Sequence, residues 1–159
     1  MALAAPGVDY EAELERLRSW YVSATPSQRL RRIRQRLADH HFGPNRLVTS
    51  VSAVEALARS LLMHRAVPRA NLLTAYPDYR NRKPEPMIRE YLRSQQIADP
   101  AAFFAQDTWR LFGYAVKYRN LLAHECTYLG LEKFPSLIES CEDVLAALAK
   151  LARLRARRT

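Results

Sequence analysis

The chain has 159 residues and a mass of 18.3 kDa, which suits one domain large enough to bury a sizeable core. Hydrophobic residues make up 48% of it and there are only 4 glycines, a balance typical of a helix-rich protein. No stretch approaches the roughly 18 apolar residues of a membrane span, and the residues before Asp9 contain no basic segment of the kind that opens a signal peptide. We therefore expect a soluble, cytoplasmic protein without a membrane partner.

The charge balance favours a polyanionic partner. Lys and Arg number 25 against 16 Asp and Glu, which gives a net charge of +9 and a pI near 10.0. Most of the basic residues are Arg, whose guanidinium can bind a phosphate through two hydrogen bonds. Basic proteins are nevertheless common, so charge alone identifies no ligand. Cys126 and Cys141 have neither CxxC spacing nor a nearby pair of histidines, so we expect no metal site. We also expect no cofactor.

Two helices are expected before residue 45. Apolar residues at helical spacing predict the first at about 8–22. The second is predicted to begin after Thr25, because Pro26 follows at the first helical position and Gln28 completes a Thr-x-x-Gln capping box. A Gly-Pro pair at 43–44 should end it.

The middle of the chain contains the longest amphipathic pattern. It predicts a core helix at about 45–65, with Glu55 off the apolar stripe. Residues 67–86 contain four prolines and are predicted to form a long irregular connection. Shorter helices are expected at about 85–95 and directly after Asp99.

Two further helices complete the expected fold. Asp107 should cap a helix at about 108–128, and the last helix should span about 135–157 with its acids early and its bases late. No internal repeat, glycine-rich phosphate loop or strand pattern is present. We therefore predict an all-α, up-and-down bundle of about five main helices in one domain. Its core is expected at about 45–154, with residues 1–44 as an N-terminal helical extension.

Candidate chemistry lies in the helix predicted at 108–128. At 100° per residue, Lys117, Asn120 and His124 lie on one side of that helix, whereas Arg119 lies on its flank. An imidazole can transfer protons near neutral pH, a guanidinium can hold a phosphodiester, and an amide can orient either group. RNA supplies its own nucleophile, the 2′-hydroxyl, so cleavage would need no metal. In-line attack uses both a base and an acid, which two copies of the motif could provide across a two-fold axis.

The spacing of Arg and His is weak support when taken alone. An Arg followed five residues later by a His occurs three times, at 36–41, 59–64 and 119–124. For His124, the structural interpretation is a partly exposed histidine in the last turns of a helix, where the helix dipole favours its protonated form. Spacing by itself favours that interpretation over catalysis.

The run from Arg119 to His124 resembles the signature of the HEPN superfamily (higher eukaryotes and prokaryotes nucleotide-binding domain). That signature is an Arg, a polar residue that is often Asn, a few mainly apolar residues and a His. The resemblance implies an all-α domain, here over about 45–154, that acts as a metal-independent endoribonuclease. Such domains dimerise so that two motifs form one cleft, and many belong to toxin–antitoxin or antiviral defence systems. It also implies that Arg119 and His124 are catalytic and that Asn120 orients groups in the site.

Glu55, under the same resemblance, and Lys117, from its place on the polar side of the helix, are supporting candidates. Glu55 would tether Arg119 or position the motif. The implied partners are RNA, a second copy of the chain, and a cognate antitoxin or regulatory protein. The chain departs from the HepT toxins, which carry a Tyr two residues after the His, because Cys126 stands there and Tyr128 lies two residues further on. That departure puts the nucleotidyltransferase-regulated mode of those toxins in doubt.

Two alternatives to catalysis remain open: a HEPN-like domain that only binds nucleic acid or a partner protein, and a helical scaffold. The basic run at 29–36 points in several directions around its helix, so part of it is solvated surface whether or not RNA binds. A second basic segment combines aromatic rings with cations, which suits single-stranded RNA, although the rings equally suit anchoring a loop to the core. Its residues are Tyr76, Tyr79, Arg80, Arg82 and Lys83.

Overall fold

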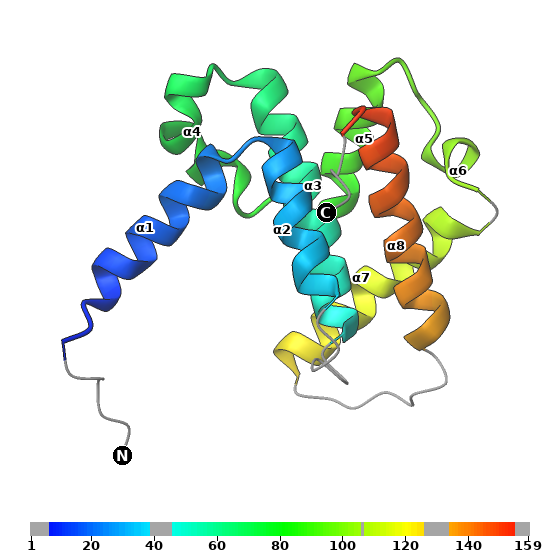
Figure 1. Cartoon of the computed structure of the whole chain (residues 1–159). Helices are drawn as coiled ribbons and strands as arrows, with labels where there is room; N and C mark the ends of the chain where they lie inside the picture. Colours follow the sequence, from blue (N-terminus) through cyan, green and yellow to red (C-terminus); the bar gives the residue numbers. More distant parts are fainter. Residues whose placement is uncertain (1–6, 39–45, 106, 126–133, 155–159) are drawn as a thin grey trace.

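The computed structural model describes residues 7–38, 46–105, 107–125 and 134–154. Within these ranges it contains helices and no strand, so the all-α prediction is confirmed (Figure 1). The helices in chain order are α1 (Tyr10–Ser23), α2 (Pro26–Leu37), α3 (Arg46–Ala66), the 3₁₀ turn η2 (Arg69–Asn71), α4 (Leu72–Tyr79), α5 (Pro84–Ser94), α6 (Pro100–Phe103), α7 (Thr108–His124) and α8 (Phe134–Leu151).

Helix α3 is the centre of the bundle, as its amphipathic pattern predicted. It packs against α2, α5, α7 and α8, and Val51, Val54 and Leu57 on its apolar face are 0% exposed. Burying each such side chain contributes about 1.5–3 kcal/mol relative to leaving it in water. The position of α3 therefore determines where the polar side chains on its other face can reach.

Helix α2 begins as its local sequence predicted. The Oγ1 of Thr25 accepts a hydrogen bond from the backbone N–H of Gln28 at 3.3 Å, and the backbone N–H of Thr25 donates to Oε1 of Gln28 at 2.8 Å. Leu30 and Ile33 of this helix are buried in the same apolar core as α3. The core therefore begins before residue 45, earlier than the boundary expected from the sequence. The Gly-Pro pair at 43–44 lies outside the described residues.

Helix α1 extends from the bundle as an arm (Figure 1). It begins as expected near residue 8, with Oδ1 of Asp9 accepting from the backbone N–H of Ala12 at 3.1 Å. Its apolar stripe is not covered, since Leu14 and Leu17 are 63% and 57% exposed. The helix packs against α4 near its C-terminal end, where Val22 is buried.

The prediction of an irregular connection at 67–86 is wrong. This segment contains η2 and α4, and α5 begins within it at Pro84. Leu72 is 1% exposed because it packs in a small apolar cluster with Val22 and Met63, and that burial stabilises α4. Pro77 lies in the last turns of α4, and Pro84 occupies the first position of α5, where its missing N–H costs no hydrogen bond. The prolines thus mark helix ends and starts.

Helix α6 begins directly after Asp99 as expected, whereas the cap predicted for α7 is wrong. Asp99 caps α6, because its Oδ1 accepts from the backbone N–H of Ala101 at 3.0 Å. Asp107 makes no such bond at the start of α7 and pairs instead with Arg110 at 3.2 Å. In the described residues α7 ends at His124, and residues 126–133 lie outside them.

Helix α8 packs along α7 and α3 and completes the bundle. Its apolar stripe is buried as predicted, with Val144 and Leu148 0% exposed. Cys141 lies on the same face, and burial raises the pKa of its thiol to about 12. This thiol is therefore a packing group, whereas Cys126 lies outside the described residues.

Gly113, within α7, is expected to tolerate a side chain. A Cβ built there lies 3.4 Å from Oε2 of Glu85, at the flexible end of a long side chain. Gly113→Ala should raise the free energy of unfolding by about 0.5–1 kcal/mol, because Ala loses less backbone entropy in a helix. Thermal unfolding measures this, with Ala146→Gly on the exposed side of α8 as a control that should lose a similar amount. A lower melting temperature for Gly113→Ala would show that Glu85 cannot move aside.

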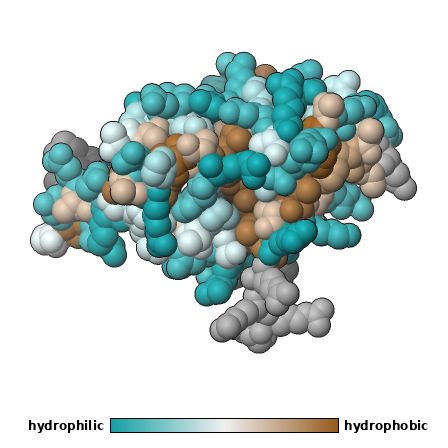
Figure 2. All heavy atoms as spheres, turned by 90° about the horizontal axis from the view of Figure 1, so that it is seen from above, coloured by the Kyte–Doolittle hydropathy of each residue, from teal (hydrophilic) through white to brown (hydrophobic). Residues whose placement is uncertain are grey.

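Hydrophilic side chains cover most of the surface seen from above, and apolar groups appear there as smaller patches between them (Figure 2). Across the described ranges, no helix is both long enough and apolar enough to cross a membrane.

Candidate functional site

Arg119 is held in a defined orientation on α7. Its Nη2 donates to Oε2 of Glu55 on α3 at 3.0 Å, and its Nε donates to Oδ1 of the neighbouring Asn120 at 3.0 Å. The side chains of Arg119 and Glu55 are only 16% and 20% exposed. A charge-assisted hydrogen bond in such a partly buried position restrains the guanidinium more strongly than a surface pair would. The resemblance implied that Glu55 tethers Arg119, and this hydrogen bond joins the two side chains.

Glu55 also binds a second guanidinium. Its Oε1 accepts from Nη2 of Arg59 at 2.8 Å, one helical turn along α3. Arg59 in turn donates to the backbone carbonyls of Tyr79 and Arg80, both at 3.3 Å. One carboxylate therefore lies between two cations, and the three groups together retain one positive charge. That charge favours an anionic ligand at this position.

Asn120 and His124 lie on the exposed side of α7, one helical turn apart. Because Oδ1 of Asn120 already accepts from Arg119, the side-chain N–H groups of Asn120 remain available as donors. Among the described residues, no group hydrogen-bonds to the His124 imidazole. An unengaged imidazole in water can exchange protons with a bound substrate.

Lys117 is exposed beside the motif. Its Nζ lies 5.5 Å from the centre of the Tyr114 ring, a cation–π contact on the outer face of α7. Tyr114 and Leu121 on this face are each 46% exposed. The residues Tyr114, Lys117, Leu121 and His124 are spaced three and four apart, the spacing with which one helix packs against another. The motif thus adjoins a partly apolar strip suited to contact with another molecule.

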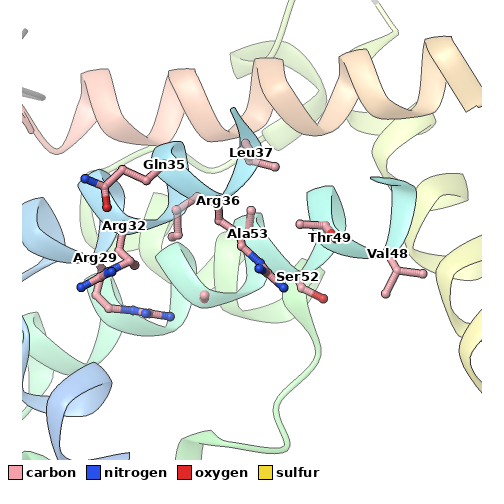
Figure 3. A pocket seen from close by; sticks show the side chains of 11 residues that line it. Arg29, Arg32, Gln35, Arg36, Leu37, Val48, Thr49, Ser52 and Ala53 are labelled. Carbon is pink, nitrogen blue, oxygen red and sulfur yellow. The ribbon is translucent and has the colours of Figure 1, made fainter. Parts of the chain in front are cut away.

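A groove of about 520 Å³ opens between α2 and α3 (Figure 3). Its floor is largely apolar, and Figure 3 shows Arg36 extending from α2 toward Ser52 of α3. Ser52 and Ala56, which line the groove, come from the same stretch of α3 as Glu55, although Glu55 itself does not line it. A basic edge above an apolar floor can bind a strand of nucleic acid. The basic residues that line it are Arg29, Arg32 and Arg36.

The segment of aromatic and basic residues at 76–83 is more engaged with the protein than the sequence suggested. Tyr76 packs edge-on against Tyr21, with ring centres 5.7 Å apart. The guanidinium of Arg82 covers the Tyr79 ring at 4.2 Å and also pairs with Glu90 at 3.0 Å. These contacts favour the anchoring role over base stacking. Of its five aromatic and basic residues, Arg80 and Lys83 are exposed.

Sequence reasoning missed two features of this region. The first is Arg59, whose position one turn after Glu55 is a signal for an ion pair within a helix. The second is the shared direction of Arg29, Arg32 and Arg36, which are spaced three and four apart on α2. Only the packing of α2 on α3 turns that spacing into one edge of a groove.

Comparisons of the chain with protein-family models, curated proteins and solved structures found no match. In the described part of the chain, no group of three or more His, Cys, Asp or Glu side chains is arranged to hold a metal ion.

Proposed function

We propose that this chain is a HEPN-like, metal-independent endoribonuclease with Arg119, Asn120 and His124 as its catalytic residues. The observation that carries this proposal is the hydrogen-bonded pair of Arg119 and Glu55, which anchors a guanidinium on the same helix as the exposed imidazole of His124. An anchored cation and a proton carrier on one helix suit phosphodiester transesterification. The net charge of +9 and the basic groove between α2 and α3 suit an RNA substrate.

The proposed reaction uses the RNA's own 2′-hydroxyl. One His124 imidazole takes the proton of that hydroxyl, and the resulting oxygen attacks the adjacent phosphorus. The bond from phosphorus to the 5′-oxygen breaks, and that oxygen takes a proton from a second imidazole in its cationic form. Nη1 of Arg119 has no acceptor among the described residues. It is proposed to donate to the phosphoryl oxygens and stabilise the negative charge that develops on them. The products are a 2′,3′-cyclic phosphate and a 5′-hydroxyl.

The second imidazole is proposed to come from another copy of the chain. Tyr114 and Leu121 support a dimer, because their exposed apolar surface lies on the same face of α7 as His124. Two copies of α7 packed across a two-fold axis would bring two motifs toward one another. The resemblance further proposes a role as a toxin or defence component, with a cognate antitoxin or regulatory protein as a partner.

Incubation of the purified chain with total RNA in excess EDTA tests the proposal. We expect fragments that carry 2′,3′-cyclic phosphate or 3′-phosphate ends, since attack by the 2′-hydroxyl produces no 3′-hydroxyl. Enzymatic labelling of the fragment ends, with and without removal of terminal phosphate, identifies these products. Intact RNA at protein concentrations that give a dimer, or fragments ending in 3′-hydroxyls, would contradict the reaction.

A non-catalytic function in nucleic-acid binding is the second candidate. The groove lined by Arg29, Arg32 and Arg36 favours it, because such a surface can bind RNA whether or not His124 reacts. Under this alternative, RNA affinity falls steeply with salt and falls again when these arginines are replaced, but the RNA stays intact.

A further inference from the structure

A second, smaller pocket of about 210 Å³ lies where α1, α2, α3 and α4 meet. Two guanidinium groups, Arg29 from α2 and Arg59 from α3, line it together with the hydroxyls of Ser60, Tyr21 and Tyr76. No carboxylate is among its lining residues. The apolar remainder of the lining consists of Val22, Ala56 and Met63.

Arg29 is a half-buried cation with no carboxylate to balance it among the described residues. Its guanidinium lies against the rings of Trp20 and Tyr21, at 5.9 Å and 5.6 Å from their centres. Burial lowers the pKa of Arg29, and repulsion from Arg59 lowers it further. A buried cation is normally paired, because removing it from water is costly unless an anion faces it. The positive charge of Arg29 is therefore available to bind an anionic ligand.

Two more donors on the α3 side lack a protein partner in the described part of the chain. Arg59 uses Nε and Nη2 for its bonds to Tyr79, Arg80 and Glu55, which leaves Nη1 without an acceptor there. The hydroxyl of Ser60 is buried and unpartnered, in a residue that is only 8% exposed. Buried hydroxyls are rarely left unsatisfied, so a missing ligand is a physical explanation for this one.

The tyrosines at the mouth of the pocket add a further donor. The hydroxyl oxygens of Tyr21 and Tyr76 lie 3.2 Å apart, so one of their two protons is used in the hydrogen bond between them and the other remains a donor. Guanidinium, serine and tyrosine donors around one cavity match the several acceptor oxygens of a phosphate group. The residues come from four different helices, so only the folded chain assembles them.

We propose that this pocket binds a phosphate-bearing ligand through Arg29, Arg59, Ser60 and Tyr76. Its volume equals that of about seven liquid water molecules at ~30 Å³ each, which suits a phosphate group with a small attached moiety. The ligand is either a free small phosphate or the terminal phosphate of an RNA. The inference does not depend on ribonuclease activity, because it concerns binding at residues other than the motif.

Calorimetric titration of the full chain with inorganic phosphate and with ribose 5-phosphate tests the site, at constant ionic strength in a phosphate-free buffer. Arg29→Gln should weaken binding about ten- to hundredfold, since it removes a charge-assisted hydrogen-bonding group. Ser60→Ala should weaken it about three- to tenfold without loss of stability, because this hydroxyl has no protein partner. Arg31→Gln removes the same charge from an exposed position on the same helix and should leave the affinity within twofold.

A second titration distinguishes the two sources of phosphate. Oligoribonucleotides of one sequence, with and without a terminal phosphate, should differ in affinity if the pocket receives an RNA end. That difference should disappear in Arg29→Gln and persist in Arg31→Gln. Two results would overturn the proposal: no binding of any of these probes at millimolar concentration, or equal weakening by Arg29→Gln and Arg31→Gln. Neither result bears on RNA cleavage, which the EDTA assay measures separately.

Discussion

His124→Ala is expected to lower the initial rate of RNA cleavage roughly 10³-fold while leaving the fold intact, because a positioned general acid or base contributes about 10²–10⁴. In a symmetric dimer the substitution removes both proton-transfer groups at once. The side chain is exposed and makes no hydrogen bond within the described residues, so the free energy of unfolding should change by less than ~0.5 kcal/mol. Initial rates on an end-labelled RNA in EDTA, together with thermal unfolding, measure the two effects.

His64→Gln is the matched control for this substitution. Arg59 and His64 share the sequence spacing of Arg119 and His124, so spacing alone would assign both histidines the same role. His64 instead lies half-buried, and burial lowers its pKa. Its replacement should leave the cleavage rate per folded molecule within about twofold. If His124→Ala retains more than a tenth of the wild-type rate, His124 is not the proton carrier and the binding function becomes the better explanation.

Glu55→Gln is expected to lower the free energy of unfolding by about 2–3 kcal/mol. The substitution removes the negative charge that two mostly buried guanidiniums share, on Arg59 and Arg119. A neutral amide keeps the size of the side chain but leaves both cations uncompensated, and they then repel one another. Arg119 should also lose its fixed orientation, so cleavage should fall more steeply than the folded fraction does. Chemical denaturation and single-turnover cleavage measure these changes.

Glu90→Gln is the control for the loss of a carboxylate that pairs with arginine. Its partner is Arg82, and the two side chains are 54% and 39% exposed, so the pair should contribute less than ~1 kcal/mol. Double-mutant cycles should give a coupling energy of about 1–2 kcal/mol between Glu55 and Arg119, and a smaller one between Glu90 and Arg82. Equal destabilisation by the two Gln substitutions would mean that the contact between α3 and α7 has no special structural role.

Local sequence patterns correctly predicted helices that are specified by capping and apolar periodicity, because both act between residues close together in the chain. The capping box of Thr25 and Gln28 predicted where α2 begins, and the apolar repeat predicted α3 within a residue of its observed ends. The order of residues in the motif also predicted that Asn120 and His124 would share the exposed side of α7. These features depend on side chains that are neighbours in the helix itself.

The segment at 67–86 shows where local reasoning failed. Its prolines suggested an irregular connection, yet burial of Leu72 against Val22 and Met63 stabilises a helix there. The exposed stripe of α1 is the opposite case, because a regular apolar pattern predicts a helix but does not identify what covers it. The helix in 67–86 therefore depends on neighbours that the local sequence does not specify, whereas the stripe of α1 stays exposed.

The sequence by itself determined the all-α class, the positions of most helices, the excess of basic over acidic residues and the presence of the motif on one helix. Only the tertiary structure decided that Glu55 contacts Arg119, a residue 64 positions away, and also Arg59. It likewise decided that Arg29 and Arg59 line one pocket without a carboxylate. The physical reason is that helical periodicity and capping act over one or two turns, whereas charge pairing and desolvation depend on which helices pack together.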